Sequence, residues 1–133
     1  VPDKNIYKNK KVIIFGGGDS ALDWTVELAK IAEKVILIHR RDEFKAVNHT
    51  VEQMRNLVKE GKVVLHTKNQ IDDVLGDSRV EKCVIRDNDA NLTEIDCDEI
   101  LIFHDSHSVS SNICQSFWVS HKTNNAGFII IRF

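Results

Sequence analysis

Short apolar runs alternate with longer amphipathic stretches in the first part of this chain. Residues 11–15 and 35–38 are mainly β-branched, aliphatic or aromatic, which is typical of strands buried on both faces of a parallel sheet. Between these runs, side chains suited to burial recur at the spacing of one helical stripe, at Ala21, Leu22, Thr25, Leu28, Ala29 and Ala32. The pattern therefore predicts a strand, a glycine-containing turn, a helix and a second strand.

A second helix and a third strand are predicted further along. Val51, Met54, Leu57 and Val58 make one helical face that ends at Gly61, and the sequence Thr50-x-x-Gln53 resembles a capping box at its start. Residues 63–65 then form another short apolar run.

From residue 71 the pattern changes from buried runs to short strands separated by turn residues. Residues 71–75, 80–86 and 92–95 predict an antiparallel meander, joined by a Gly76-Asp77 turn and a polar loop at 87–91. Residues 100–103 return as a buried strand. The predicted fold class is α/β, a Rossmann-like parallel sheet with flanking helices and a small antiparallel β-meander.

The turn after the first strand, residues 16–21, reads Gly-Gly-Gly-Asp-Ser-Ala. Gly16 permits a tight turn, Gly18 lets the backbone approach a pyrophosphate, and Ala21 lets the helix pack closely on the strand. The free N–H groups at a helix start favour an anion, and Asp19 or Ser20 is suited to cap that helix. The alternative is a glycine-rich turn that binds no ligand.

The end of the second strand carries the residues that would select the cofactor. Dinucleotide folds that bind NAD place an acidic residue there, whereas NADP-binding folds place arginine, which pairs with the 2′-phosphate. Here the strand runs into His39, Arg40 and Arg41, with no acid before Asp42. The pattern favours NADPH over a merely solvated basic turn.

These two motifs resemble the NADPH-binding domain of thioredoxin-reductase-like flavoproteins, and within them the ferredoxin–NADP(+) reductase branch. The resemblance runs from about Asn9 to Phe103. Asp19 and Asp23-Trp24 favour that branch. Thioredoxin reductases also carry a Cys-x-x-Cys pair just before the first strand, whereas no cysteine precedes Cys83 in this chain.

The resemblance implies NADPH as the cofactor and a set of binding residues. The pyrophosphate contacts fall on Gly16, Gly17, Gly18, Asp19, Ser20 and Ala21. Arg40 and Arg41, helped by His39 and Lys45, would hold the 2′-phosphate. Lys45 stands where the family has arginine, which keeps the charge but loses the planar fork.

We therefore expect a single NADPH-binding domain over residues 1–133, with 1–10 as a lead-in and 104–133 as a return segment. The FAD-binding domain is expected to be absent, since its glycine fingerprint and Gly-Asp motif are missing. FAD, and a ferredoxin or flavodoxin-like acceptor, are implied only for a full-length enzyme. We assign no catalytic residue, and we expect the chain alone not to be catalytically competent.

Two other functions stay open. The chain could be a non-catalytic relic or interaction module that keeps the fold, which Ser106 favours because the family has glycine near that position. A thioredoxin reductase domain is disfavoured by the missing cysteine pair. The apolar residues 129–133 leave open packing on the core or a homodimer.

Composition narrows the class further. With 42% hydrophobic and 29% charged residues, the chain is typical of a globular domain, and its net charge of −2 argues against nucleic-acid binding. No apolar run approaches a membrane span, so we expect no membrane association. Three cysteines without ligand spacing predict buried or idle thiols in a reducing cytoplasm, and the scattered histidines predict no metal site.

Overall fold

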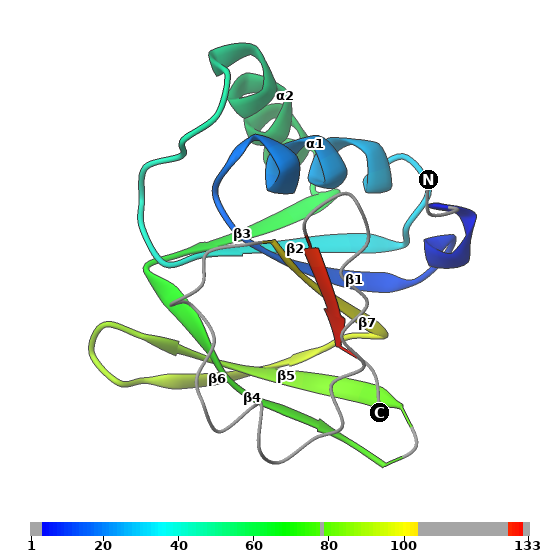
Figure 1. Cartoon of the computed structure of the whole chain (residues 1–133), viewed down its shortest axis with the longest axis vertical. Coiled ribbons are helices and arrows are strands. Elements are labelled where there is room, and N and C mark those ends of the chain that lie inside the picture. Colours follow the sequence, from blue (N-terminus) through cyan, green and yellow to red (C-terminus); the bar gives the residue numbers. More distant parts are fainter. Residues whose placement is uncertain (1–3, 78, 104–127, 132–133) are drawn as a thin grey trace.

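The computed structural model describes residues 4–77, 79–103 and 128–131. Within these residues two α-helices cover one face of a mainly parallel sheet, and a smaller antiparallel sheet lies against the other face (Figure 1). The helices are the 3-10 turn η1 (Lys4–Tyr7), α1 (Asp19–Leu28) and α2 (Asn48–Lys59). This arrangement confirms the predicted fold class.

The main sheet has the strand order β3-β2-β1-β7-β8 among the described strands. Its members are β1 (Lys11–Phe15), β2 (Lys34–His39), β3 (Val63–Thr67), β7 (Glu99–Phe103) and β8 (Phe128–Ile131). Strands β1, β2, β3 and β7 are parallel, and β8 runs antiparallel to β7 at the edge. The chain moves outward from β1 to β3 and then returns to the other side of β1, so the strand order reverses beside β1. Ligands of such sheets bind at the carboxyl ends of the strands at this reversal.

Successive side chains of β1 face opposite layers, which explains its unbroken apolar run. Val12 and Ile14 belong to the cluster under the helices, whereas Ile13 and Phe15 belong to the cluster against the small sheet. All four are at most 1% exposed. Both faces of the strand are therefore buried, as the sequence predicted.

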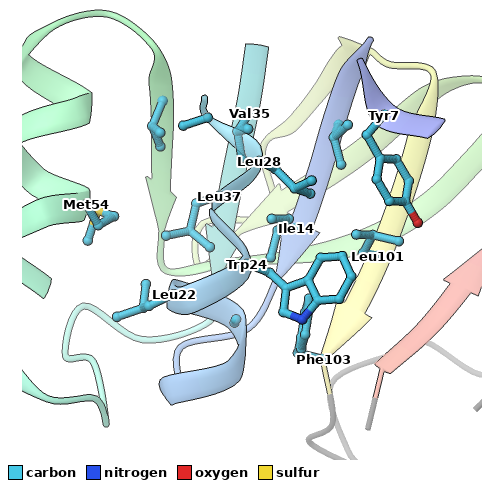
Figure 2. Close-up of a cluster of buried hydrophobic side chains, with 14 residues drawn as sticks. Tyr7, Ile14, Leu22, Trp24, Leu28, Val35, Leu37, Met54, Leu101 and Phe103 are labelled. Carbon is cyan, nitrogen blue, oxygen red and sulfur yellow. The ribbon is translucent and has the colours of Figure 1, made fainter. Parts of the chain in front are cut away.

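Trp24 of α1 connects three elements in the helix-side cluster (Figure 2). Its ring lies edge-on to Tyr7 of η1, with centroids 6.5 Å apart, and 6.1 Å from the ring of Phe103 at the end of β7. Aromatic pairs in these geometries add to the stability gained from burial. Trp24 thus fixes α1 against the carboxyl end of β7.

The second sheet is the predicted meander, made of β4 (Asn69–Gly76), β5 (Val80–Asp87) and β6 (Leu92–Asp96). Its inner face carries Cys83, and Cys97 follows β6; both thiols are free and buried. Burial raises the pKa of Cys97 to about 12 and that of Cys83 further still. The burial predicted for the cysteines is confirmed for these two, whereas Cys114 lies outside the described residues.

The predicted helix boundaries need correction. The capping box at Thr50 and Gln53 is wrong, because α2 already begins at Asn48, and the backbone N–H of Thr50 donates to the carbonyl of Val47 at 3.0 Å. The predicted end at Gly61 is confirmed, since Gly61 has φ +81° and follows the cap. The first helical stripe continues past the end of α1 into a turn, where the N–H of Ala32 donates to Leu28 at 2.7 Å.

The C-terminal region extends the main sheet. Residues 128–131, which the sequence pattern assigned only to a return segment, form β8 beside β7. Ser106, His104, His107 and the remainder of residues 104–127 lie outside the described residues.

Candidate functional site

The glycine turn after β1 and the connection from β2 to α2 lie together at the carboxyl ends of the parallel strands, on the left side of Figure 1. We call residues 40–46 the arginine loop. The backbone N–H of Lys45 in this loop donates to the carbonyl of Gly17 at 2.8 Å. Gly18 and Lys45 also form a parallel bridge. The two predicted motifs are therefore joined by backbone pairing and make one candidate site.

Gly16 occupies a position that only glycine fits. Its φ is +147°, and a Cβ placed there would lie 3.0 Å from the Cβ of Ala21 and 3.1 Å from that of Phe103. Both distances are shorter than side chains normally approach. The tight turn predicted at Gly16 and the small residue predicted at position 21 are confirmed by this packing.

Gly18 is the N-cap of α1 and leaves the start of the helix open. Its backbone is extended (φ −93°, ψ −177°), and a Cβ there would meet only the carbonyl oxygen of Lys45, at 4.0 Å. No side chain caps the helix. The first-turn N–H groups and the positive end of the helix dipole are thus available to an anion.

The predicted capping role of Asp19 or Ser20 is wrong. Both residues lie inside α1, beyond the N-cap at Gly18, and both are exposed. The Oδ1 atom of Asp19 instead accepts a hydrogen bond from the backbone N–H of Val47, at 2.9 Å. Asp19 therefore ties the start of α1 to the start of α2.

The cationic residues of the arginine loop differ in exposure. Arg40 is half-buried, whereas Arg41 and Lys45 are exposed. The nearby carboxylate of Asp42 lies 3.8 Å from the Nζ atom of Lys68, just after β3, and both side chains are well exposed. The positive charge of Lys68 partly neutralises the Asp42 carboxylate, which follows the two arginines in the chain. Because both side chains are exposed, this ion pair adds little to stability.

His39 occupies a place that its sequence position did not indicate. Its imidazole lies against Gly17, where a Cβ at residue 17 would lie 2.6 Å from Nδ1 and nearer still to Cε1 and Nε2. The Nε2 atom donates to the carbonyl of Glu43 at 2.7 Å. His39 thus contacts the glycine turn and the arginine loop together.

Phe44 and Arg55 also belong to the candidate site, although the sequence pattern did not indicate them. The ring of Phe44 stacks on that of His39, with centroids 5.1 Å apart and planes inclined by 28°. The guanidinium carbon of Arg55, from α2, lies 5.8 Å from the centroid of Phe44. In the sequence, the only sign of this contact is that Phe44 is an aromatic residue five positions after His39. The two rings meet because of the path of the arginine loop, which the sequence pattern does not reveal.

Other chemistries find little support in the part of the chain that the structure describes. Those residues contain no group of three His, Cys, Asp or Glu side chains able to hold a metal ion. Neither described α-helix has the length and apolar character that a membrane crossing requires.

Comparison with known proteins identifies the family. The profile of the pyridine nucleotide-disulphide oxidoreductases matches residues 11–89. A ferredoxin–NADP reductase of Bradyrhizobium diazoefficiens is 49% identical over 98 residues, covering 73% of this chain and 28% of that protein. The ferredoxin–NADP reductase of Pelagibacter ubique is 41% identical over 103 residues, covering 77% and 30% respectively. The chain thus spans less than a third of the length of these relatives.

Solved structures agree on the fold. Thioredoxin reductase from Streptococcus pyogenes matches with a TM-score of 0.69 at 22% identity, over 77% of this chain and 33% of that one. Bacillithiol disulfide reductase from Staphylococcus aureus matches with a TM-score of 0.70 at 18% identity, over 96% of this chain and 38% of that one. These comparisons confirm the resemblance predicted from the glycine and His-Arg-Arg motifs. The chain belongs to the pyridine nucleotide-disulphide oxidoreductase family.

Proposed function

We propose that this chain is the NADPH-binding domain of a ferredoxin–NADP(+) reductase-like flavoprotein. The observation that carries the proposal is the direct attachment of the arginine loop to an uncapped helix start. The backbone N–H of Lys45 donates to the carbonyl of Gly17 at 2.8 Å. Gly18, at the N-cap position of α1, has no side chain that could bond to the first N–H groups of the helix. One surface therefore combines a site for a pyrophosphate with a site for a further phosphate.

The glycine turn fits the pyrophosphate of a dinucleotide. Gly18 presents backbone without a Cβ, and the space that a Cβ would enter there is open. The backbone N–H groups at the start of α1 would donate to phosphate oxygens, assisted by the helix dipole. In this arrangement Asp19, Ser20 and Ala21 contribute backbone N–H groups rather than side chains.

Arg40 and Arg41 would select NADPH over NADH. They follow β2 directly, at the place where NAD-specific domains carry an acid for the ribose hydroxyls. A guanidinium group binds phosphate through paired hydrogen bonds, and NADH offers no 2′-phosphate to receive them. The Nζ atom of Lys45 adds a third positive charge from the same loop.

The nicotinamide, when bound, supplies a hydride for a flavin in the whole protein. The residues of this chain bind and orient that donor. The FAD domain and a ferredoxin or flavodoxin-like acceptor belong to the whole protein in this proposal. This part of the proposal rests on the similarity to ferredoxin–NADP reductases, of whose length this chain spans less than a third.

Titration calorimetry of the purified chain with NADPH and with NADH tests the assignment. Loss of charge-assisted contacts to a partly exposed phosphate is worth about 1.5–3 kcal/mol, so NADPH should bind roughly ten- to a hundredfold more tightly. Equal affinities would remove the selector role of the arginines. Absence of binding by either dinucleotide would favour a domain that keeps the fold without the function.

A further inference from the structure

A stack of three side chains connects the end of β2, the arginine loop and α2. His39 is the last residue of β2, Phe44 lies near the end of the arginine loop, and Arg55 belongs to α2. The ring of Phe44 stacks on the imidazole, with centroids 5.1 Å apart, and the guanidinium carbon lies over the same phenyl ring, 5.8 Å from its centroid. We call these residues the His39 stack.

The stack is also attached to the glycine turn. The imidazole of His39 fills the space beside Gly17 that any larger residue would need. Its Nε2 atom holds the carbonyl of Glu43 at 2.7 Å. Phe44 is half-buried and packs against the cluster under the helices. The imidazole is therefore enclosed between the loop and the turn, and its Nε2 atom is committed to a backbone carbonyl.

Two anchors enclose the residues that would meet the 2′-phosphate. On one side His39 contacts Gly17, and on the other the N–H of Lys45 donates to the carbonyl of the same Gly17, at 2.8 Å. Arg40 and Arg41 lie between these anchors. A loop held at both ends has fewer conformations to lose when a ligand binds.

We propose that His39 is a positioning residue, which with Phe44 and Arg55 holds the arginine loop on the glycine turn before the cofactor arrives. This inference rests on the proposed function for its ligand, but its structural part requires none. It reassigns His39 from a direct phosphate contact to a support for Arg40 and Arg41. Preorganisation of this kind raises affinity by lowering the entropy lost on binding.

The first test needs no cofactor and follows hydrogen exchange at the amide of Lys45, which reports the anchor to Gly17. Phe44→Ala removes the centre of the stack and should accelerate this exchange at least about tenfold, whereas Phe44→Tyr keeps the stacked ring and should match the parent. The Arg55→Met variant, on the exposed face of α2, should give a smaller acceleration. Since Arg55 is exposed, this variant keeps the test available if Phe44→Ala does not fold.

A size exchange tests the contact between His39 and Gly17. Gly17→Ala places a methyl group where the imidazole lies and should accelerate exchange at Lys45. His39→Ala alone should also accelerate this exchange, because it removes the imidazole that holds the loop. Since both substitutions disrupt the same contact, the double variant should accelerate exchange by less than the product of the two single effects. Accelerations that multiply would contradict the contact between His39 and Gly17.

The second test measures dissociation constants for NADPH and NADH in the same variants. Phe44→Ala should weaken NADPH about tenfold and NADH by less than about twofold, because only the 2′-phosphate contact depends on the loop. Unchanged exchange at Lys45 in Phe44→Ala, or equal weakening of both dinucleotides, would overturn the inference. If the parent shows no preference for NADPH, the proposed function fails, while the exchange measurements still decide whether the stack holds the loop.

Discussion

Gly16 at the end of β1 packs against Phe103 at the end of β7, so closely that a Cβ on the glycine would lie 3.1 Å from the Cβ of the phenylalanine. A Cβ on Gly16 would also lie 3.0 Å from the Cβ of Ala21, on α1. The glycine turn is thus packed between the main sheet and α1. This close packing places the open N-terminus of α1 at the point where the strand order reverses.

Gly16→Ala should lower the free energy of unfolding by about 2–4 kcal/mol. The left-handed backbone at φ +147° and the two short contacts each add strain. Gly18→Ala is the matched control, since its backbone is extended and its surroundings are open, and it should change stability by less than about 1 kcal/mol. Urea unfolding of both variants measures the difference. Similar stabilities would contradict the packing account of the turn.

Gly18→Val should abolish dinucleotide binding while the domain still folds. The extended backbone of Gly18 (φ −93°) accepts a β-branched residue without strain, and the added methyl groups fill the space where the pyrophosphate would approach. Thermal unfolding separates the two effects. The variant should unfold cooperatively near the parent temperature and should lack the upward shift that NADPH gives the parent. A variant still stabilised by NADPH would mean that the phosphates bind elsewhere.

Asp19→Asn should strengthen NADPH binding by about two- to fivefold at low salt. The substitution keeps an oxygen to accept the hydrogen bond from Val47, yet it removes a negative charge from the first turn of α1, where the pyrophosphate would lie. Added salt should reduce the gain because it screens exposed charges.

Asp23→Asn is the control for this prediction, because Asp23 is exposed on the same helix and lies farther from its start. It should alter the affinity less than Asp19→Asn does. Weaker binding by Asp19→Asn would show that the carboxylate supports the site through more than its bond to Val47.

The buried thiols should make the fold sensitive to alkali. Burial raises the pKa of Cys97 from 9.0 to about 12, and the pKa of Cys83 is also raised. The folded state therefore binds more protons than the unfolded chain above pH 9. Their contribution to stability is complete below this pH and declines as the pH rises toward about 12.

Urea unfolding between pH 8 and pH 11 checks the alkaline loss, with Cys97→Ala as the comparison. Removing one thiol should make the decline with pH less steep. Equal slopes in the parent and the variant would contradict the burial of a neutral thiol at position 97.

The sequence predicted the elements of the fold more accurately than their ends. The buried strands around Ile13 and Ile36 were recognisable because both faces are covered, which leaves an unbroken apolar run. The start of α2 was misplaced because Val47 has no capping side chain. The start is instead tied to Asp19, 28 positions earlier in the chain. Local pattern carries no information about such a partner.

For the candidate site, too, the sequence predicted the segments better than the details of their contacts. The glycine and arginine motifs lie next to strand ends, and the topology of a parallel sheet brings those ends together. The inward position of His39 and its stacking with Phe44 depend on the path of the arginine loop, which no periodicity describes. The sequence thus predicted which segments lie together. It did not predict which side chains are placed to bind a ligand and which hold the loop in position.

Calorimetry of the parent and of Arg40→Ala/Arg41→Ala, with both NADH and NADPH, decides whether the arginines select the cofactor. We expect the ratio of the NADH and NADPH dissociation constants to be about ten to a hundred in the parent and close to one in the double variant, with NADH affinity unchanged. Lys82→Ala/Arg86→Ala removes the same number of charges from the exposed face of the meander and should keep the parent ratio. A parent ratio near one, or an unchanged ratio in the arginine variant, would contradict the assignment of an NADPH site.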